Sequence, residues 1–344
     1  SGAFIKKIDK DTFTIFGEIC TIYHSENPLY DKNFYSADLD IQSEEMDNPF
    51  LKISEEKQGL AILENYENML TTLIEGLKDV VPLVGIGIPG VKSKDKRGIV
   101  VANNGPRIPR FLDVLEHRLD LNGHAHHPIK TLENDSDCCG VGELYSEHGL
   151  FRDIESGLFL GSGTGISDSI LLNGKLMSFD EIETWMPKTW QIKNDIGIPI
   201  ESLISYKGLI TQYSKLTKTP FSKLVNNNIF PEQFLKTKVA ISIKTEFVST
   251  ISYLILERIE ALFLKKPDLK FDNIILGLRF VHMLKEIPEL LIEIRKSVKN
   301  RVKNSTILNQ VSKNHYIQNS VIIISKTPYA PAIGAGVIAY QNVK

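Results

Sequence analysis

The sequence predicts an α/β protein made of two domains. Short apolar runs alternate with segments in which apolar residues recur every three or four positions, and this alternation is typical of sheets covered by helices. The 344 residues, of which 42% are hydrophobic and 24% charged, are enough for two ordinary cores. We therefore expect mixed sheets flanked by helices in two domains with a cleft between them, and we exclude a disordered or fibrous chain.

The net charge and the cysteine content indicate which kinds of binding partner the protein can have. Forty Lys and Arg against 42 Asp and Glu leave a net charge of −2, so no positive field would draw the protein onto nucleic acid or anionic lipid. No window holds the roughly 18 unbroken apolar residues of a membrane span. The three cysteines (Cys20, Cys138 and Cys139) form neither a disulfide framework nor a CxxC zinc pattern. We expect a cytoplasmic protein that binds a small molecule, with no nucleic-acid or membrane partner.

The first half of the chain alternates strand and helix. Residues 13–23, rich in β-branched and aromatic side chains, predict one or two strands. A three- and four-residue apolar period predicts a helix from Ser54, its N-cap, to about Asp79. The apolar run 80–90, closed by Pro-Gly, predicts a buried strand and a turn.

The remaining elements repeat this pattern. A helix at 111–119, a strand at 129–132 and a helix from Asp135 to Tyr145 come first. Strands at 157–160 and 166–172 follow as a hairpin-like pair closed by Asn173-Gly174, a strong turn signal. Further elements are expected as helices at 232–265, 283–302 and 332–339, the last rich in small residues, and as strands at 273–277 and 321–324.

The first candidate site is Glu133-Asn134-Asp135, which follows a strand and opens a helix. Open α/β sheets bind ligands at the carboxyl ends of their strands, and an Asp there can accept a proton from a substrate hydroxyl. The alternative is that Asp135 or Ser136 only caps the helix.

The second candidate site is the turn Gly161-Ser162-Gly163-Thr164-Gly165. Its glycines would let backbone N–H groups surround a phosphate, with two hydroxyls as further donors. It is neither a Walker A loop nor the dinucleotide fingerprint. The alternative is a tight hairpin turn.

Two further segments are weaker candidates for a functional site. The Pro89-Gly90 turn could bring backbone against a ligand, although a plain buried strand explains the same run. The histidines at 124, 126 and 127 lack a matching carboxylate or cysteine spacing, so we predict no metal site from protein side chains alone.

Taken in order, these segments resemble the ROK family, the sugar kinases and sugar-responsive repressors of the actin-like ATPase superfamily. Residues 85–90 are similar to the family's GIG-x-PG turn, and Glu133-Asn134-Asp135 to its END segment. The likeness covers 83–176 well and the rest loosely. Its other matching segments are 160–165 and 172–176 (second phosphate loop and hairpin), 274–277 (nucleotide-side strand) and 333–336 (terminal helix).

The resemblance implies a fold and a division of the chain. It implies two actin-like ATPase (ribonuclease H-like) domains with mixed sheets flanked by helices and a cleft between them. The first would span residues 1–130, with a C-terminal helix at about 330–344 packing back on it, and the second residues 131–329. We also keep a homodimer as an open alternative to a monomer.

The resemblance also implies a glucokinase-like activity, in which the γ-phosphoryl group of ATP, with Mg²⁺, is transferred to a hydroxyl of a hexose or amino sugar. In that scheme Asp135 is the catalytic base. The implied sugar-side residues are Asn134, Glu181, Thr184, Pro89 and Gly90, and the implied nucleotide-side residues are Gly161, Ser162, Gly163, Thr164, Gly165, Gly277, Asp9 and Thr12.

The chain departs from the family on the nucleotide side. Where sugar kinases begin with DxGGT, the nearest match is Asp9-Lys10-Asp11-Thr12, without either glycine. Gly277-Leu278-Arg279 replaces a run of glycines, and Asp180 to Thr184 retains little of GE-x-GH. The family's zinc segment is not found, so we expect no zinc.

These departures leave a rival function open, a non-catalytic sugar- or metabolite-binding homologue that has lost ATP turnover. A DNA-binding repressor would need a helix-turn-helix before the core, whereas residues 1–50 predict strands and a polar loop. An assembly or scaffold role rests only on the small-residue terminal helix.

Overall fold

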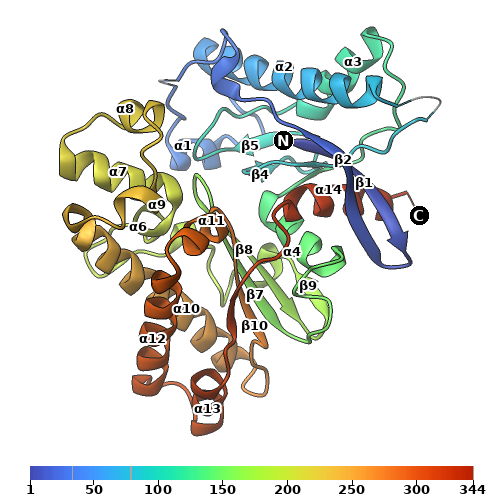
Figure 1. Ribbon diagram of the computed structural model, residues 1–344. Helices are drawn as coiled ribbons and strands as arrows, with labels where there is room; N and C mark the ends of the chain where they lie inside the picture. The colour runs from blue at the N-terminus through green and yellow to red at the C-terminus, as the bar shows by residue number, and fades with distance from the viewer. Residues whose placement is uncertain (33, 78–79, 344) are drawn as a thin grey trace. The chain divides into compact units, whose positions relative to one another are not determined.

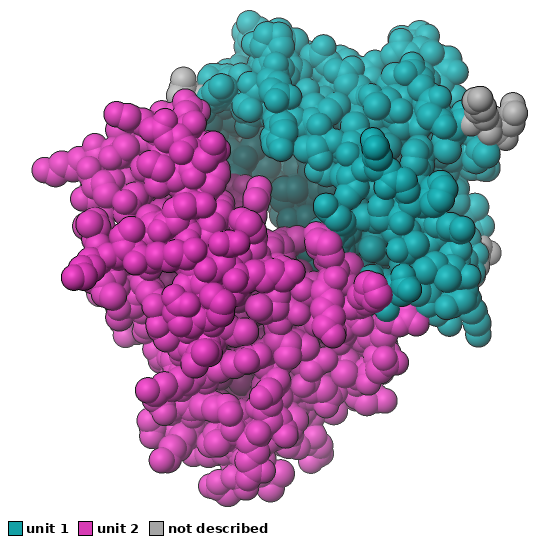
Figure 2. Space-filling view, viewed as in Figure 1, with its two compact units in different colours: residues 1–147, 329–344 teal, residues 148–328 magenta. Residues whose placement is uncertain are grey.

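The computed structural model describes residues 1–32, 34–77 and 80–343 and divides the chain into two compact units (Figures 1 and 2). Unit 1 comprises residues 1–147 and 329–344, and unit 2 comprises residues 148–328. Both units combine strands with helices, so the predicted α/β class is confirmed. The cleft expected between the units stays a prediction.

The described residues of unit 1 form three two-stranded sheets. An N-terminal antiparallel hairpin comes first, a parallel pair joins two segments far apart in the chain, and a second antiparallel pair lies between those segments in sequence. The pairs are β1 (Gly2–Asp9) with β2 (Thr12–Cys20), β3 (Ile86–Gly87) with β6 (Leu132–Glu133), and β4 (Val91–Lys92) with β5 (Ile99–Val101).

In the part of unit 1 that the structure describes there are five α-helices, and the last two pack against each other. A Cβ added to Gly334 would collide with the Cys138 carbonyl, so α4 and α14 are held at a distance that only small residues permit. This contact places residues 131–147 in unit 1, whereas the sequence analysis put the boundary after residue 130. The helices are α1 (Leu39–Glu44), α2 (Ile53–Glu75), α3 (Phe111–Leu121), α4 (Asp135–Tyr145) and α14 (Ala330–Gln341), with a 3-10 turn at His24–Glu26.

Two expectations for unit 1 need correction. Lys52, not Ser54, is the N-cap of α2, and the expected end at Asp79 lies outside the described residues. Only Ile86–Gly87 of the run 80–90 forms a strand, and Val80 and Val81 are exposed. Pro82 lacks the N–H that a sheet ladder needs, which shortens the strand.

Unit 2 is built on a mixed five-stranded sheet in the order β11-β10-β7-β8-β9. β10 is parallel to β7 and β11, while β8 is antiparallel to both of its neighbours. The predicted hairpin is confirmed, but Asn173-Gly174 closes β8 onto β9, and residues 163–165 join β7 to β8. The strands are β7 (Gly157–Ser162), β8 (Ile166–Leu172), β9 (Lys175–Met177), β10 (Asn273–Leu278) and β11 (Ile322–Ile324).

The helices of unit 2 break where the sequence predicts continuous ones. Thr237 is extended and separates α9 from α10, and Pro288 opens α12 directly after α11. The helices are α5 (Phe179–Ile182), α6 (Glu201–Ile204), α7 (Tyr206–Thr217), α8 (Phe221–Asn226), α9 (Pro231–Phe234), α10 (Ile241–Lys265), α11 (Arg279–Glu286), α12 (Pro288–Asn304) and α13 (Gln310–Gln318), with 3-10 turns at Thr189–Gln191 and Lys238–Ala240.

The longest helix belongs to the core of unit 2. Among the described residues, the helical stretch Lys238–Lys265 is long and apolar enough to cross a bilayer by composition. Its Ile251, Leu254 and Ile255 are buried in the same core as the sheet, and α10 packs beside α12 (Figure 1). Arg258 on this helix is also buried and pairs with Asp168 of β8 at 2.7 Å. We therefore assign the stretch to the protein core.

Candidate active site

The parallel pairing of β3 with β6 brings the first and third candidate segments together in unit 1. Gly87 is paired with Glu133, and the Ile88 amide donates to the Glu133 carbonyl at 2.9 Å. The Pro89-Gly90 turn and the start of α4 therefore leave the same edge of this small sheet. Gly90 has φ +111°, which favours glycine, and a Cβ there would lie 2.7 Å from the Val101 carbonyl oxygen.

Asp135 is the first residue of α4. The N-cap is Asn134, whose backbone is extended, so neither Asp135 nor Ser136 occupies the capping position that the simpler interpretation gave them. Asp135 is half-buried, and its charge acts on groups of the core. Burial, reinforced by Asp135, raises the pKa of Tyr66 to about 12 and raises the pKa of the Cys139 thiol.

Lys92 joins the turn to the helix, a connection that the sequence analysis missed. Its ammonium donates to the Ile88 carbonyl (2.7 Å), the Gly90 carbonyl (2.7 Å) and Asn134 Oδ1 (2.9 Å). Burial lowers the pKa of Lys92 to about 8, against the opposing pull of Asp135. The only sequence signal was a lysine two residues after Pro-Gly.

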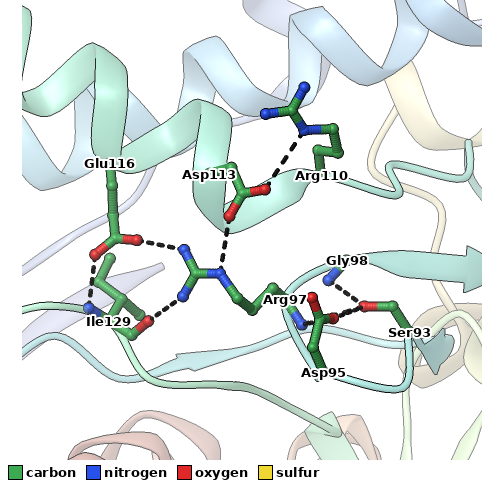
Figure 3. A network of polar contacts seen from close by, with 8 residues as sticks. All are labelled: Ser93, Asp95, Arg97, Gly98, Arg110, Asp113, Glu116 and Ile129. Carbon is green, nitrogen blue, oxygen red and sulfur yellow. Dashed lines mark hydrogen bonds and ion pairs between the residues drawn. The ribbon is translucent and has the colours of Figure 1, made fainter.

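A second unpredicted group, Arg97, holds the segment that leads into β6 (Figure 3). Its guanidinium donates to Asp113 and Glu116 of α3 and to the Ile129 carbonyl, at 2.5–2.8 Å. Glu116 in turn accepts from the Ile129 amide at 2.8 Å. The carbonyl and the amide of Ile129 are thus both held by hydrogen bonds, which fixes the backbone ahead of Asn134-Asp135.

The glycine turn of unit 2 is contacted by α6 and α7. Glu201 accepts from the Ile166 amide at 2.9 Å, and a Cβ on Gly165 would lie 2.7 Å from the same carboxylate oxygen. The buried Ser162 hydroxyl accepts from the Tyr206 amide at 2.9 Å. Gly163 faces open space and Thr164 is exposed. The Ser162 hydroxyl of the predicted phosphate site is therefore already hydrogen-bonded within the protein, and the Glu201 carboxylate lies beside Gly165.

Gly277 contributes packing at the neighbouring strand. It is paired with Gly161, and a Cβ there would collide with the Phe159 ring. The next residue, Leu278, has φ +55° and ψ −127°, a backbone conformation that favours glycine. Its side chain covers Gly161, since a Cβ on that glycine would lie 2.8 Å from Leu278 Cδ1. Leu278 therefore holds a backbone conformation that glycine adopts more readily.

The first loop, Asp9-Lys10-Asp11-Thr12, is the turn between β1 and β2 in unit 1. Asp9 is exposed, and its Oδ1 accepts from the Asp11 amide at 3.0 Å. Thr12 is buried, and among the described residues its Oγ1 has no hydrogen-bond partner. The two central residues of this turn, Lys10 and Asp11, carry side chains and are not glycines.

The remaining predicted sugar contacts lie in unit 2. Glu181 is exposed in the short helix α5, and Thr184 is exposed just after it. Their role as sugar contacts stays a prediction.

The described residues contain no group of three or more His, Cys, Asp or Glu side chains arranged to hold a metal ion. Mg²⁺ in phosphoryl-transfer sites is bound by one or two carboxylates together with the phosphates of the nucleotide. Asp9 is an exposed carboxylate at the first loop, and its part in holding Mg²⁺ stays a prediction.

Comparisons with known proteins cover the sequence only in part. No protein-family profile matches the chain. N-acetyl-D-glucosamine kinase of Pectobacterium carotovorum is 27% identical over 126 residues, which are 35% of this chain and 39% of that enzyme. The match thus spans about two fifths of the relative's length.

Solved structures cover more of the chain. A ROK family glucokinase from Streptomyces griseus, in complex with glucose and AMPPNP, matches with a TM-score of 0.56 and 16% identity over 81% of this chain and 88% of that one. A ROK family transcriptional regulator, a homologue of the E. coli MLC protein, matches with a TM-score of 0.54 and 14% identity over 83% of this chain and 69% of that one. Because a kinase and a regulator share this architecture, the likeness establishes the fold and not the activity. The protein has a mixed α/β fold similar to that of the solved ROK family structures, the glucokinase and the regulator among them.

Proposed function

We propose that the protein is an ATP-dependent carbohydrate kinase whose acceptor is a hexose or amino sugar. The observation that carries this proposal is the junction of the Pro89-Gly90 turn with Asn134 and Asp135 at one sheet edge of unit 1. The fold of ROK kinases and the partial likeness to an N-acetyl-D-glucosamine kinase support it.

Asp135 is the proposed general base. Its carboxylate accepts the proton of the acceptor hydroxyl as the sugar oxygen forms a bond to the γ-phosphorus, and the bond from that phosphorus to the bridging oxygen breaks to release ADP. Positioning dominates such reactions, so the backbone held at Ile129, ahead of Asn134, supports this assignment. The resemblance assigns contacts with phosphate oxygens to the glycine turn, and bound Mg²⁺ would offset their charge.

The test replaces Asp135 with Asn. Turnover, followed as ADP release with glucose or N-acetylglucosamine, should fall by about 10²–10⁴, the usual contribution of a general base. Sugar affinity, measured by calorimetry, should change little. Asp120→Asn, which alters an exposed carboxylate of α3, is the matched control. Undiminished turnover in Asp135→Asn would remove this residue from the mechanism.

The second candidate is a sugar- or metabolite-binding protein without turnover. Glu201 beside Gly165 and the Leu278 side chain over Gly161 favour it, because both occupy the glycine turn where phosphates would bind. The missing glycines of the first loop support it as well.

Thermal unfolding with separate ligands separates the two candidates. A ligand present at about 100 times its Kd adds roughly 2.7 kcal/mol to the free energy of unfolding. Stabilisation by both Mg·ATP and a sugar supports the kinase. A response to sugar with none to Mg·ATP supports the second candidate.

A further inference from the structure

Lys92 links the two segments that carry the proposed sugar contacts. It lies in β4, directly after the Pro89-Gly90 turn, and reaches Asn134 at the start of α4. Its three ammonium hydrogens have three acceptors, two on the turn and one on the Asn134 side chain. A half-buried ammonium satisfied in this way is a fixed structural connection rather than a solvated surface charge.

This contact determines which way the Asn134 amide faces. A lysine ammonium only donates hydrogen bonds, so the Asn134 atom that contacts it is the oxygen. The nitrogen is thereby turned away from Lys92 and lies 3.4 Å from Asp137 Oδ2. It carries two hydrogens, and the second can be donated to a ligand.

We propose that Lys92 is a positioning residue of the sugar site, which fixes Asn134 as a hydrogen-bond donor to a sugar oxygen and holds the Pro89-Gly90 turn beside it. The proposal rests on the proposed function in that the ligand is a sugar. It assigns to Asn134 an oxygen acceptor, such as a hydroxyl or an acetamido carbonyl.

Deprotonation of Lys92 should weaken this arrangement. A neutral amine has two hydrogens for the three oxygens around it, so one of these oxygens would face the lone pair of the nitrogen and lose its hydrogen bond. The charged or titratable groups that face Lys92 are Glu133 of β6 and Asp135, Asp137 and Cys138 of α4, and all four raise its pKa against the larger effect of burial. The strand paired with β4, Ile99–Val101, has no titratable side chain.

The first experiment measures the affinity for glucose and for N-acetylglucosamine by calorimetry at pH 7. Lys92→Met should weaken binding by about tenfold to a hundredfold, the usual effect of losing a charge-assisted hydrogen bond. Lys94→Met, at an exposed lysine two residues along, should bind as the wild type does. Equal affinities of Lys92→Met and Lys94→Met would overturn the proposal.

The pH profile adds a readout that a purely structural role would not move. Wild-type affinity should fall above pH 8, whereas Lys92→Arg, which stays charged, should bind more tightly than Lys92→Met and show no such fall. If Lys92→Met does not fold, the pH profiles of wild type and Lys92→Arg test the proposal without it. Parallel profiles of these two proteins would refute the proposal.

A third measurement needs no ligand. Nuclear magnetic resonance of ¹⁵N-asparagine-labelled protein should show the Asn134 side-chain signals shifting with a midpoint near pH 8, and no such shift in Lys92→Met. Unmoved Asn134 signals overturn the positioning role itself. Shifting signals without binding of either sugar would instead refute the proposed function, and with it the sugar part of this proposal.

Discussion

The Glu201 carboxylate accepts a hydrogen bond from the Ile166 amide at 2.9 Å, at the end of the glycine turn to which the family resemblance gives a role in phosphate binding. A carboxylate resembles a phosphate in charge and in the donors it prefers. Glu201 therefore meets the turn in the way an anionic ligand would, and a triphosphate would have to approach against its charge.

Replacement of Glu201 by Gln should make Mg·ATP bind more tightly. The change removes a like charge next to the turn while keeping the size of the side chain, and we expect a gain of about tenfold or more. Affinity is read by calorimetry, with Glu289→Gln at an exposed position of α12 as control. Unchanged affinity in Glu201→Gln would mean that this carboxylate does not oppose nucleotide binding.

At position 278, a glycine variant should be more stable than an alanine variant, which is the reverse of the usual order of stability. Its positive φ strains any residue with a Cβ by roughly 1–3 kcal/mol, so Leu278→Gly loses the side-chain packing but relieves the strain, whereas Leu278→Ala loses packing and keeps the strain. We expect Leu278→Gly to be the more stable of the two in urea unfolding. The ordinary order, with alanine more stable by about 0.5–1 kcal/mol, would show that the strain is absent.

Arg107 should be essential to unit 1. Its buried guanidinium donates to Glu55 at 2.9 and 3.0 Å and to Glu45 at 2.6 Å, which ties α2 to the end of α1. Arg107→Ala leaves the buried Glu55 charge without this partner and should cost about 3–5 kcal/mol of unfolding free energy. Arg110→Ala, at an exposed arginine nearby, should stay within about 0.5 kcal/mol of the wild type. Equal losses in both variants would contradict this difference.

Lys92 should make stability rise with pH. Burial lowers its pKa from 10.5 to about 8, so between these values the unfolded chain holds a proton that the folded protein has released. The free energy of unfolding therefore increases with pH, and this contribution is complete above 10.5 and is lost as the pH falls through 8. It amounts to roughly 3 kcal/mol. The measurement is the free energy of unfolding in urea of wild type and of Lys92→Met, compared at pH values from 7 to 10.5. A difference between the two proteins that stays constant over this range would disprove the prediction.

The local patterns of the chain predicted much of the fold. The fully buried strand β7 was visible as an apolar run, and α4 as a helix opening after a strand, because burial on both faces and helical periodicity are written in adjacent residues. The strand β8, whose centre is Ser167-Asp168-Ser169, was located by the apolar residues at its ends and by the turn that follows it. Pro82 and Pro288 limited that approach, since an apolar run does not show where the backbone stops pairing or where one helix becomes two.

The site was only half visible in the sequence. Asn134 and Asp135 stood out by their place after a strand, but Lys92 contacts Asn134 across 42 positions and Glu201 contacts Ile166 across 35. Such contacts between residues distant in the chain depend on the topology and have no local signal. For Leu278 the resemblance indicated a run of glycines at this place, but a leucine by itself does not show that its backbone keeps a conformation that suits glycine.

The close contact of α14 with α4 has a consequence for synthesis on the ribosome. Unit 2 is one continuous stretch, and the helix that completes unit 1 follows it in the sequence, so this helix is translated only after unit 2. The nascent chain can therefore finish unit 2 while α4 still exposes the face around Cys138 that Gly334 later covers. A premature stop before residue 330 would leave that face uncovered and make the shortened product a target for chaperones and proteases.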